Sequence, residues 1–307
     1  MRRCRRIQKT VVHTNRTHIA HVQPNLTVDC TSSGNGGKSP TSFWELPTAG
    51  KVTHLAEKID LDPDHSTTGM NEVSEQVIDS LYDVFRPYQL GSDFDGCDHC
   101  VDPVATKRLA RIDLRNLSME DLSRYSQKAI TTWGDDRHFR YFLPRLFELV
   151  LEDPRHESLH IEVLFGKLAY ANWYQWHQRE REAIGSYFEL LWKSVLSQPA
   201  LFQDDDIADS VLCAFGAARA DLDAFLSYWT TTNENAARTH FNEFVVLNAS
   251  YLRDKDRLWN TFWENDSKES TTVKEWLSSD SLRTLILSRE ACADERGLEA
   301  ILAIQTL

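Results

Sequence analysis

The stretch from Cys97 to Leu149 reads CDHCVDPVATKRLARIDLRNLSMEDLSRYSQKAITTWGDDRHFRYFLPRLFEL, and it joins a close cysteine pair to three sharply bounded helical segments. Asp102 followed by Pro103 is typical of a helix N-cap with proline at the first helical position. Ser118 and Asp121 have the spacing of a capping box in which aspartate replaces the usual glutamate. These boundaries predict one helix that starts at Pro103 and another that starts just after Ser118.

Apolar residues in the second and third segments recur at the spacing of a helix. The second segment carries one apolar face, formed by Leu122, Tyr125, Ala129 and Trp133. Gly134 is a natural C-terminal stop for this helix. In the third segment, Pro144 falls inside an otherwise helical pattern, which predicts a kink or a short helix joined to a longer one.

The same periodicity extends over the rest of the chain. A helix is predicted from an N-cap at Asn71 to a stop at Pro87. Further helices are predicted near residues 157–175, 178–197, 205–215, 221–230, 234–252, 256–264, 271–279 and 281–305, the last with a break near 293–297. Because no alternating strand pattern occurs, we predict an all-α, multi-helical fold.

A weak internal echo leaves two helical architectures open. The segments Phe225–Trp229 and Trp259–Trp263 lie 34 residues apart, and each is expected to end a short helix. That offset suits helical-hairpin repeats of an α-solenoid kind. The alternative is an irregular helical domain.

Residues 1–66 differ in composition from the remainder. They are rich in Thr, Ser, Asn, Gly and His, and no helical or strand period persists in them. We therefore predict a disordered segment over 1–66 and a single α-helical domain over 67–307. Met70 directly precedes the first clear helix, so residues 1–69 are a candidate for a dispensable or untranslated segment.

The charge of the chain bears on its partners and location. The formal net charge of the 307 residues is −12, which argues against nucleic acid as the main partner. Residues 1–66 hold nine Lys/Arg and six Asp/Glu, so the remaining chain holds 25 and 40. No apolar stretch is long enough to span a membrane, and no apolar core of a secretory signal follows the basic N-terminus. We expect a cytoplasmic protein with a protein partner and no membrane contact.

Cys97 and Cys100 form a Cys-x-x-Cys pair that can supply two zinc ligands from one turn. Tetrahedral zinc needs two more ligands, and the candidates are His99 inside the pair and His138 or Asp135 at the start of a nearby helix. A redox pair is the second interpretation, although neighbouring aspartates disfavour a reactive thiolate. Ordinary structural thiols are the third.

A second metal motif is the H-E-x-x-H match at His156, Glu157 and His160. On a helix, the two imidazoles face the same way and can share zinc, while the glutamate activates a water. Pro154 lies just upstream, so the match falls at a helix start, where a solvated turn is the alternative. Candidates for a third ligand are the acidic residues of the next helix, Glu180, Glu182 and Glu189, and nothing in the sequence singles one out.

A run of aromatic residues offers a candidate groove. Tyr170, Tyr174 and Trp176 fall outside the apolar stripe of their predicted helix, so we expect them at the surface. Trp173 shares that stripe with Phe165, which favours core packing.

Several blocks of the chain together resemble a group of uncharacterised bacterial all-helical proteins. The matching blocks are Cys97-x-x-Cys100-Val101, Leu117-Ser118, Asp121–Tyr125, Lys128–Gly134, Phe139, Phe142–Arg145, Phe165–Leu168 and Glu275–Leu277. The resemblance implies an all-helical fold. It implies no mechanism, because no activity is established for the group.

The sequence favours a non-catalytic helical scaffold or protein-interaction protein. The predicted contact residues are Tyr125, Thr131, Thr132, Trp133 and Arg145, because the stretch Thr131–Gly134 is polar and aromatic at a predicted helix end, where a turn can present side chains to a partner. In the alternative interpretation, Trp133 anchors that helix end in the core. The other functions that stay open are a zinc-dependent hydrolase acting through Glu157 and a structural zinc protein acting through the cysteine pair.

Overall fold

The computed structural model describes residues 66–203, 205–288 and 293–307, with side chains from residue 71 onward. The predicted disordered segment 1–66 lies outside the described residues, except for Ser66. The candidate dispensable segment 1–69 lies outside them up to residue 65. The chain divides into the units Met1–Asn71 and Glu72–Leu307. The first described helix begins in the first unit and continues into the second, which holds all the other helices.

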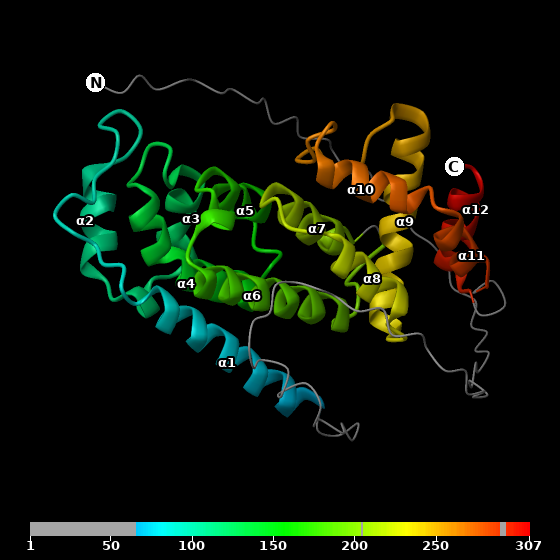
Figure 1. Ribbon diagram of the computed structural model, residues 1–307, viewed down its shortest axis with the longest axis horizontal. Helices are drawn as coiled ribbons and strands as arrows, with labels where there is room; N and C mark the ends of the chain where they lie inside the picture. Colours follow the sequence, from blue (N-terminus) through cyan, green and yellow to red (C-terminus); the bar gives the residue numbers. More distant parts are fainter. Residues whose placement is uncertain (1–65, 204, 289–292) are drawn as a thin grey trace. The chain divides into compact units, whose positions relative to one another are not determined.

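The described residues form an all-α fold, as predicted (Figure 1). The helices are α1 (Ser66–Phe85), α2 (Pro103–Arg111), α3 (Met119–Lys128), α4 (Asp136–Glu152), α5 (Ile161–Tyr170), α6 (Gln178–Ser197), α7 (Ile207–Ala217), α8 (Asp223–Thr231), α9 (Asn235–Lys255), α10 (Lys268–Leu277), α11 (Asp280–Ser288) and α12 (Glu295–Gln305). Short 3-10 helices span Leu114–Asn116 and Trp173–Gln175. Within the described ranges, the only extended pairings are two isolated bridges that both involve Trp133.

The predicted N-caps of α2 and α3 are confirmed. The Asp102 side chain accepts a hydrogen bond from the backbone N–H of Val104, and Pro103 opens α2. Ser118 and Asp121 form the reciprocal capping box at the start of α3. These short-range contacts satisfy helix N–H groups that have no partner within the helix.

Two predicted boundaries are wrong. α1 begins at Ser66, so Asn71 is not its N-cap. α3 ends at Lys128, because Ala129 turns to an extended conformation and Ile130 has φ 66°, so the helix never reaches Gly134. α4, by contrast, runs as one helix through Pro144.

The core of the Glu72–Leu307 unit is strongly aromatic. The rings of Phe147 and Tyr187 stack with centroids 4.1 Å apart, and the Tyr187 hydroxyl donates to the Phe147 carbonyl over 2.8 Å. Phe165, Phe188 and Phe215 continue this stack from α5, α6 and α7. Large rings contribute most to burial energy, so this stack holds α4, α5, α6 and α7 together.

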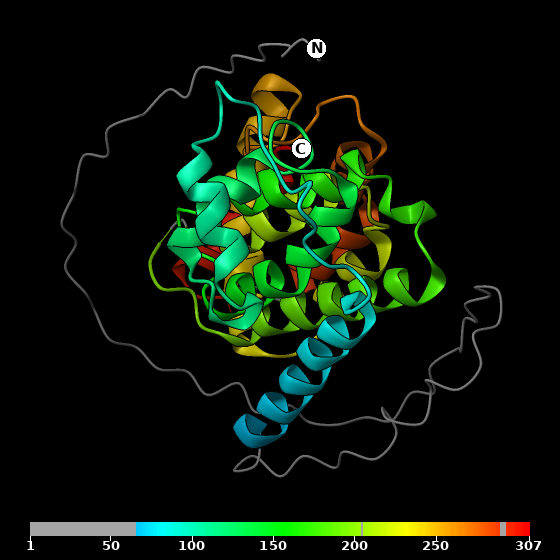
Figure 2. The ribbon, with the colours of Figure 1, turned by 90° about the vertical axis from the view of Figure 1, so that its left-hand side faces the viewer.

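α1 lies at the outside of this unit, as its colour shows in Figure 2. It buries the narrow stripe made by Ile78, Leu81 and Phe85. Asp79, Ser80 and Asp83 on its other faces are exposed. α1 therefore presents a polar face that no other described helix covers.

The helix predicted near 256–264 is absent. α9 ends where Asp256 adopts φ 50°, and the residues up to Ser267 form turns. The Asn260 side chain accepts the backbone N–H of Phe262, which stabilises a turn in place of a helix. The echo of Phe225–Trp229 and Trp259–Trp263 thus joins a helix with a non-helical segment, so it marks no repeated hairpin.

Candidate functional site

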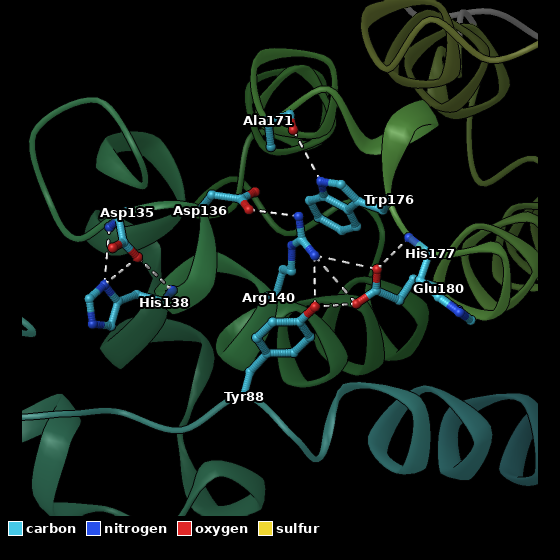
Figure 3. Close-up of polar contacts among 9 residues, drawn as sticks. All are labelled: Tyr88, Asp135, Asp136, His138, Arg140, Ala171, Trp176, His177 and Glu180. Carbon is cyan, nitrogen blue, oxygen red and sulfur yellow. Dashed lines mark hydrogen bonds and ion pairs between the residues drawn. The ribbon is translucent and has the colours of Figure 1, made fainter.

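Arg140 lies at the centre of a polar cluster that joins three parts of the chain (Figure 3). Arg140 and Asp136 come from α4. Tyr88 follows the end of α1, Trp176 lies just before α6, and Glu180 belongs to the first turn of α6. We call these five residues the Arg140 cluster.

The guanidinium of Arg140 contacts every other member of the cluster. It donates to the Tyr88 hydroxyl over 2.7 Å and lies 2.7 Å from the Asp136 carboxylate and 3.4 Å from that of Glu180. Its central carbon lies 4.0 Å from the centre of the Trp176 ring. This combination of charge pairing and stacking is a geometry that arginine provides and lysine does not.

Glu180 is held by the first turn of α6. It occupies the third helical position, and one carboxylate oxygen accepts the backbone N–H of His177 over 2.9 Å, which completes a capping box. Its other oxygen accepts the Tyr88 hydroxyl. Glu180 is buried, so its charge depends on these donors and on Arg140.

Burial changes the acidity of two members of the cluster. Desolvation raises the pKa of Tyr88, and its hydrogen bond to Glu180 raises it further. Desolvation also raises the pKa of the Asp136 carboxyl, although the Arg140 charge acts in the opposite direction. The cluster is a half-buried network of charges that fastens the end of α1 to α4 and α6.

A groove of about 740 Å³ opens beside the cluster, between α1 and the first turn of α6. Its lining residues are Gln76, Asp79, Ser80, Asp83, Val84, Pro87, Tyr88, His177, Arg179 and Glu180. Tyr88 and Glu180 thus belong to both the groove and the cluster. The side chains of Asp79 and Asp83 are 67% and 68% exposed on the α1 side of the groove, where Asp79 pairs with Arg115 and Asp83 pairs with Arg86.

The predicted contact residues near the end of α3 divide by burial. Tyr125 and Trp133 are 0% and 1% exposed, so the expectation that these rings face a partner does not fit the structure. They are core residues because their rings pack on each other, edge to face. Thr131 is exposed and Thr132 is half-buried, so a partner can reach both.

Arg145, the fifth predicted contact residue, is engaged within the chain. It donates to the Leu117 carbonyl over 2.8 Å and to the Glu148 carboxylate over 2.7 Å. The bond to Leu117 ties α4 to the segment before α3, and the bond to Glu148 lies within α4.

Cys97 and Cys100 share one turn, in which the Cys100 N–H donates to the Cys97 carbonyl. His138 is buried, and its Nδ1 contacts the Asp135 carboxylate over 2.7 Å at the start of α4 (Figure 3). Among the described residues, no three His, Cys, Asp or Glu side chains gather closely enough to hold a metal ion. Neither His99 nor His138 therefore joins the two cysteines as the predicted third ligand.

The H-E-x-x-H match lies in turns and not on a helix. His160 has φ 41° and stands before α5, which begins at Ile161. His156 uses its Nδ1 to accept the N–H of Ser158. Since His156, Glu157 and His160 share no helical turn, the spacing does not place the two imidazoles on one face.

The aromatic run follows the prediction in part. Tyr170 and Tyr174 are 61% and 47% exposed, as expected. Trp176 is buried, because Arg140 covers its ring and its indole N–H donates to the Ala171 carbonyl. Trp173 is half-buried and donates to the Ala218 carbonyl.

No protein-family model matches the chain, and neither curated proteins nor solved structures include a significant match. The resemblance of its sequence blocks to bacterial all-helical proteins therefore stays a prediction. In the described part of the chain, no helix combines the length and hydrophobicity that crossing a membrane requires.

Proposed function

We propose that this chain is a non-catalytic helical interaction protein that receives a partner segment in the groove between α1 and α6. The observation that carries the proposal is the groove itself, one wall of which is fastened by the Arg140 cluster. Tyr88 and Glu180 are held in place by Arg140, so that wall is preorganised. Preorganised surfaces lose little conformational freedom on binding.

The composition of the groove supports a partner segment of mixed character. Val84, Pro87 and Tyr88 supply apolar area, and Asp79 and Asp83 supply exposed carboxylates at the rim, each of which is shared with one arginine of this chain. A segment with an apolar residue flanked by Lys or Arg complements this pattern, because opposite charges favour encounter and orientation. The pairing among the charges of the cluster suits holding helices together rather than reacting with a substrate.

Site-specific photocrosslinking in cells of the native host tests the proposal. A photoreactive amino acid at Ser80, which lines the groove, should yield one discrete adduct with a second protein. The control position is Glu275, an exposed residue of α10 that does not line the groove. The adduct should weaken when Asp79 and Asp83 are both changed to Lys.

Two results would contradict the proposal. One is the absence of any adduct from Ser80. The other is the same set of adducts from Ser80 and Glu275, since that pattern indicates random collision.

A further inference from the structure

Two carboxyl side chains are buried where α5 packs on α7. Asp209 of α7 is 1% exposed, and Glu162 of α5 is 9% exposed. No salt bridge to a cation is found for either residue within the described ranges. A buried carboxylate without a cation is costly, and protonation is the usual way of lowering that cost.

Asn248 of α9 links Asp209 to the segment that joins α9 to α10, residues 256–267, which we call the α9–α10 connection. The Asn248 amide nitrogen donates to Asp209 Oδ1 over 2.8 Å. Its amide oxygen accepts the backbone N–H of Trp259 over 2.9 Å. One asparagine side chain therefore bridges the buried acid and the backbone of the connection.

Asn260 makes the second link between the connection and the acids. Its amide nitrogen donates to Glu162 Oε1 over 3.0 Å, and its oxygen accepts the N–H of Phe262 over 2.9 Å. Trp263 packs close to Gly216 of α7, where a Cβ would lie 2.4 Å from the ring. The connection thus covers the two acids. Its Trp263 ring fits against α7 because position 216 is glycine and has no side chain in the way.

The remaining oxygen of Asp209 shows what this site can bind. Asp209 Oδ2 is buried and has no hydrogen-bond partner among the described residues. Each amide oxygen of Asn248 and Asn260 accepts one backbone N–H group, and among the described residues no third His, Cys, Asp or Glu side chain joins the two acids to form a metal-binding group. A proton is the ligand that the free oxygen can still take.

The surroundings of Asp209 favour its protonated form up to near-neutral pH. Burial raises the pKa of Asp209 to about 7, and the charges of Asp206 and Glu162 add to the increase. The amides of Asn248 and Asn260 act in the opposite direction. Cys213, one turn further along α7, stays a thiol because burial and Asp209 raise its pKa.

We propose that Asp209 is a proton-operated latch, which holds the α9–α10 connection closed while it carries its proton and lets the connection open when the proton leaves. Loss of the proton places a second negative charge beside Glu162 with no cation to offset it. The carboxylate is then solvated only if the connection lifts and admits water.

The direction of the pH effect follows from the proton count. When the connection is open, Asp209 meets water and binds its proton more weakly than when it is closed. Between the two pKa values the closed form holds more protons, so rising pH favours the open form. The opening equilibrium constant should increase by up to about tenfold per pH unit and level off above a pH of about 7.

Hydrogen exchange of the full chain between pH 5 and 8.5 tests the latch. The reporters are the backbone amides of Trp259 and Phe262, with rates corrected for the intrinsic pH dependence of exchange. The wild-type opening constant should rise with pH and then level off. Asp209→Asn, which keeps the shape without the acid, should remove this dependence.

Asp266→Asn is the matched control, since it removes an exposed carboxylate from the same connection. It should behave as the wild type does. Amides at the centre of α6 should show no similar rise, which separates local opening from unfolding of the whole chain.

The proposal would be overturned if Asp209→Asn kept the wild-type pH dependence of the opening constant. It would also be overturned if the opening constant of the wild type did not depend on pH. Should Asp209→Asn fail to fold, Glu162→Gln gives a second test. Removing that negative neighbour should lower the pH at which opening levels off, and an unchanged profile would also overturn the latch.

Discussion

The Arg140 cluster and the Asp209 site solve the burial of two carboxyl groups in opposite ways. Around Arg140, the carboxylates of Asp136 and Glu180 share one guanidinium. At the core site, Asp209 and Glu162 are held by asparagine amides and no cation is paired with them in the described chain. Burial raises the pKa of both Asp136 and Asp209, but the charge of Arg140 opposes the increase at Asp136, whereas no paired cation opposes it at Asp209.

The largest expected effect comes from removing the cation of the Arg140 cluster. Arg140→Met should lower the free energy of unfolding by about 3 kcal/mol at pH 7, because it leaves buried Glu180 without its charge partner. Urea denaturation measures this. The matched control is Arg137→Met one turn away, whose exposed pair with Asp93 should matter far less. Equal losses in the two variants would break the contrast.

Removing the acid at the core site should change the free energy of unfolding in the opposite direction. Asp209→Asn should raise the free energy of unfolding by about 2 kcal/mol at pH 8, where the wild type must keep a charged carboxylate in the core. Since the folded-state pKa of Asp209 is raised to about 7, wild-type stability falls as pH rises toward that value. The advantage of the variant should shrink as pH falls toward 3.8 and vanish well below that value, where the acid is protonated in both states. A variant less stable than the wild type at pH 8 would contradict this account.

Lys167 extends the comparison to a buried base. Its ammonium lies 3.4 Å from the Thr131 hydroxyl, and burial lowers the pKa of Lys167 to about 8. Lys167→Met should stabilise the chain at pH 7 by about 1 to 2 kcal/mol, less than the full shift implies because the amine keeps some contact with water. A folded-state pKa below the unfolded one makes wild-type stability rise as pH increases from about 8 to about 10.5. Thermal unfolding of Lys167→Met and the wild type at pH 7 and 10 measures the difference in stability. A stabilisation by Lys167→Met that grows with pH would contradict the prediction.

The smallest effect concerns the hydroxyl that links α1 to the cluster. Tyr88→Phe should cost about 1 kcal/mol, because Glu180 loses a donor while the ring still packs. Chemical denaturation of this variant, with Tyr174→Phe as an exposed control, measures the difference. A loss as large as that of Arg140→Met would show that the hydroxyl, and not the guanidinium, holds the cluster together.

The sequence predicts the helices well where caps and period agree. The bounds of α6 match the predicted 178–197, and the caps at Asp102 and Ser118 are local features that need no knowledge of the fold. The prediction for 256–264 failed because an Asn260 turn competes with helix formation in a segment that has apolar residues at helical spacing.

The two polar sites were beyond the reach of the sequence for different reasons. Arg140 and Tyr88 are 52 residues apart, and only the packing of α1 against α4 and α6 brings them together. His177 and Glu180 have the spacing of a capping box, a local pattern that could have indicated the role of Glu180. Asp209 stands within the apolar run of α7, and that position could have marked it as a buried acid.

The most direct test of the contrast between paired and unpaired acids is a carbon NMR titration of the Asp209 side-chain carboxyl in the full chain. We expect a midpoint near pH 7, with the carboxylic acid form dominant at pH 6. A midpoint near 3.8, the ordinary value for aspartate, would show that Asp209 is charged in the core and would contradict the contrast.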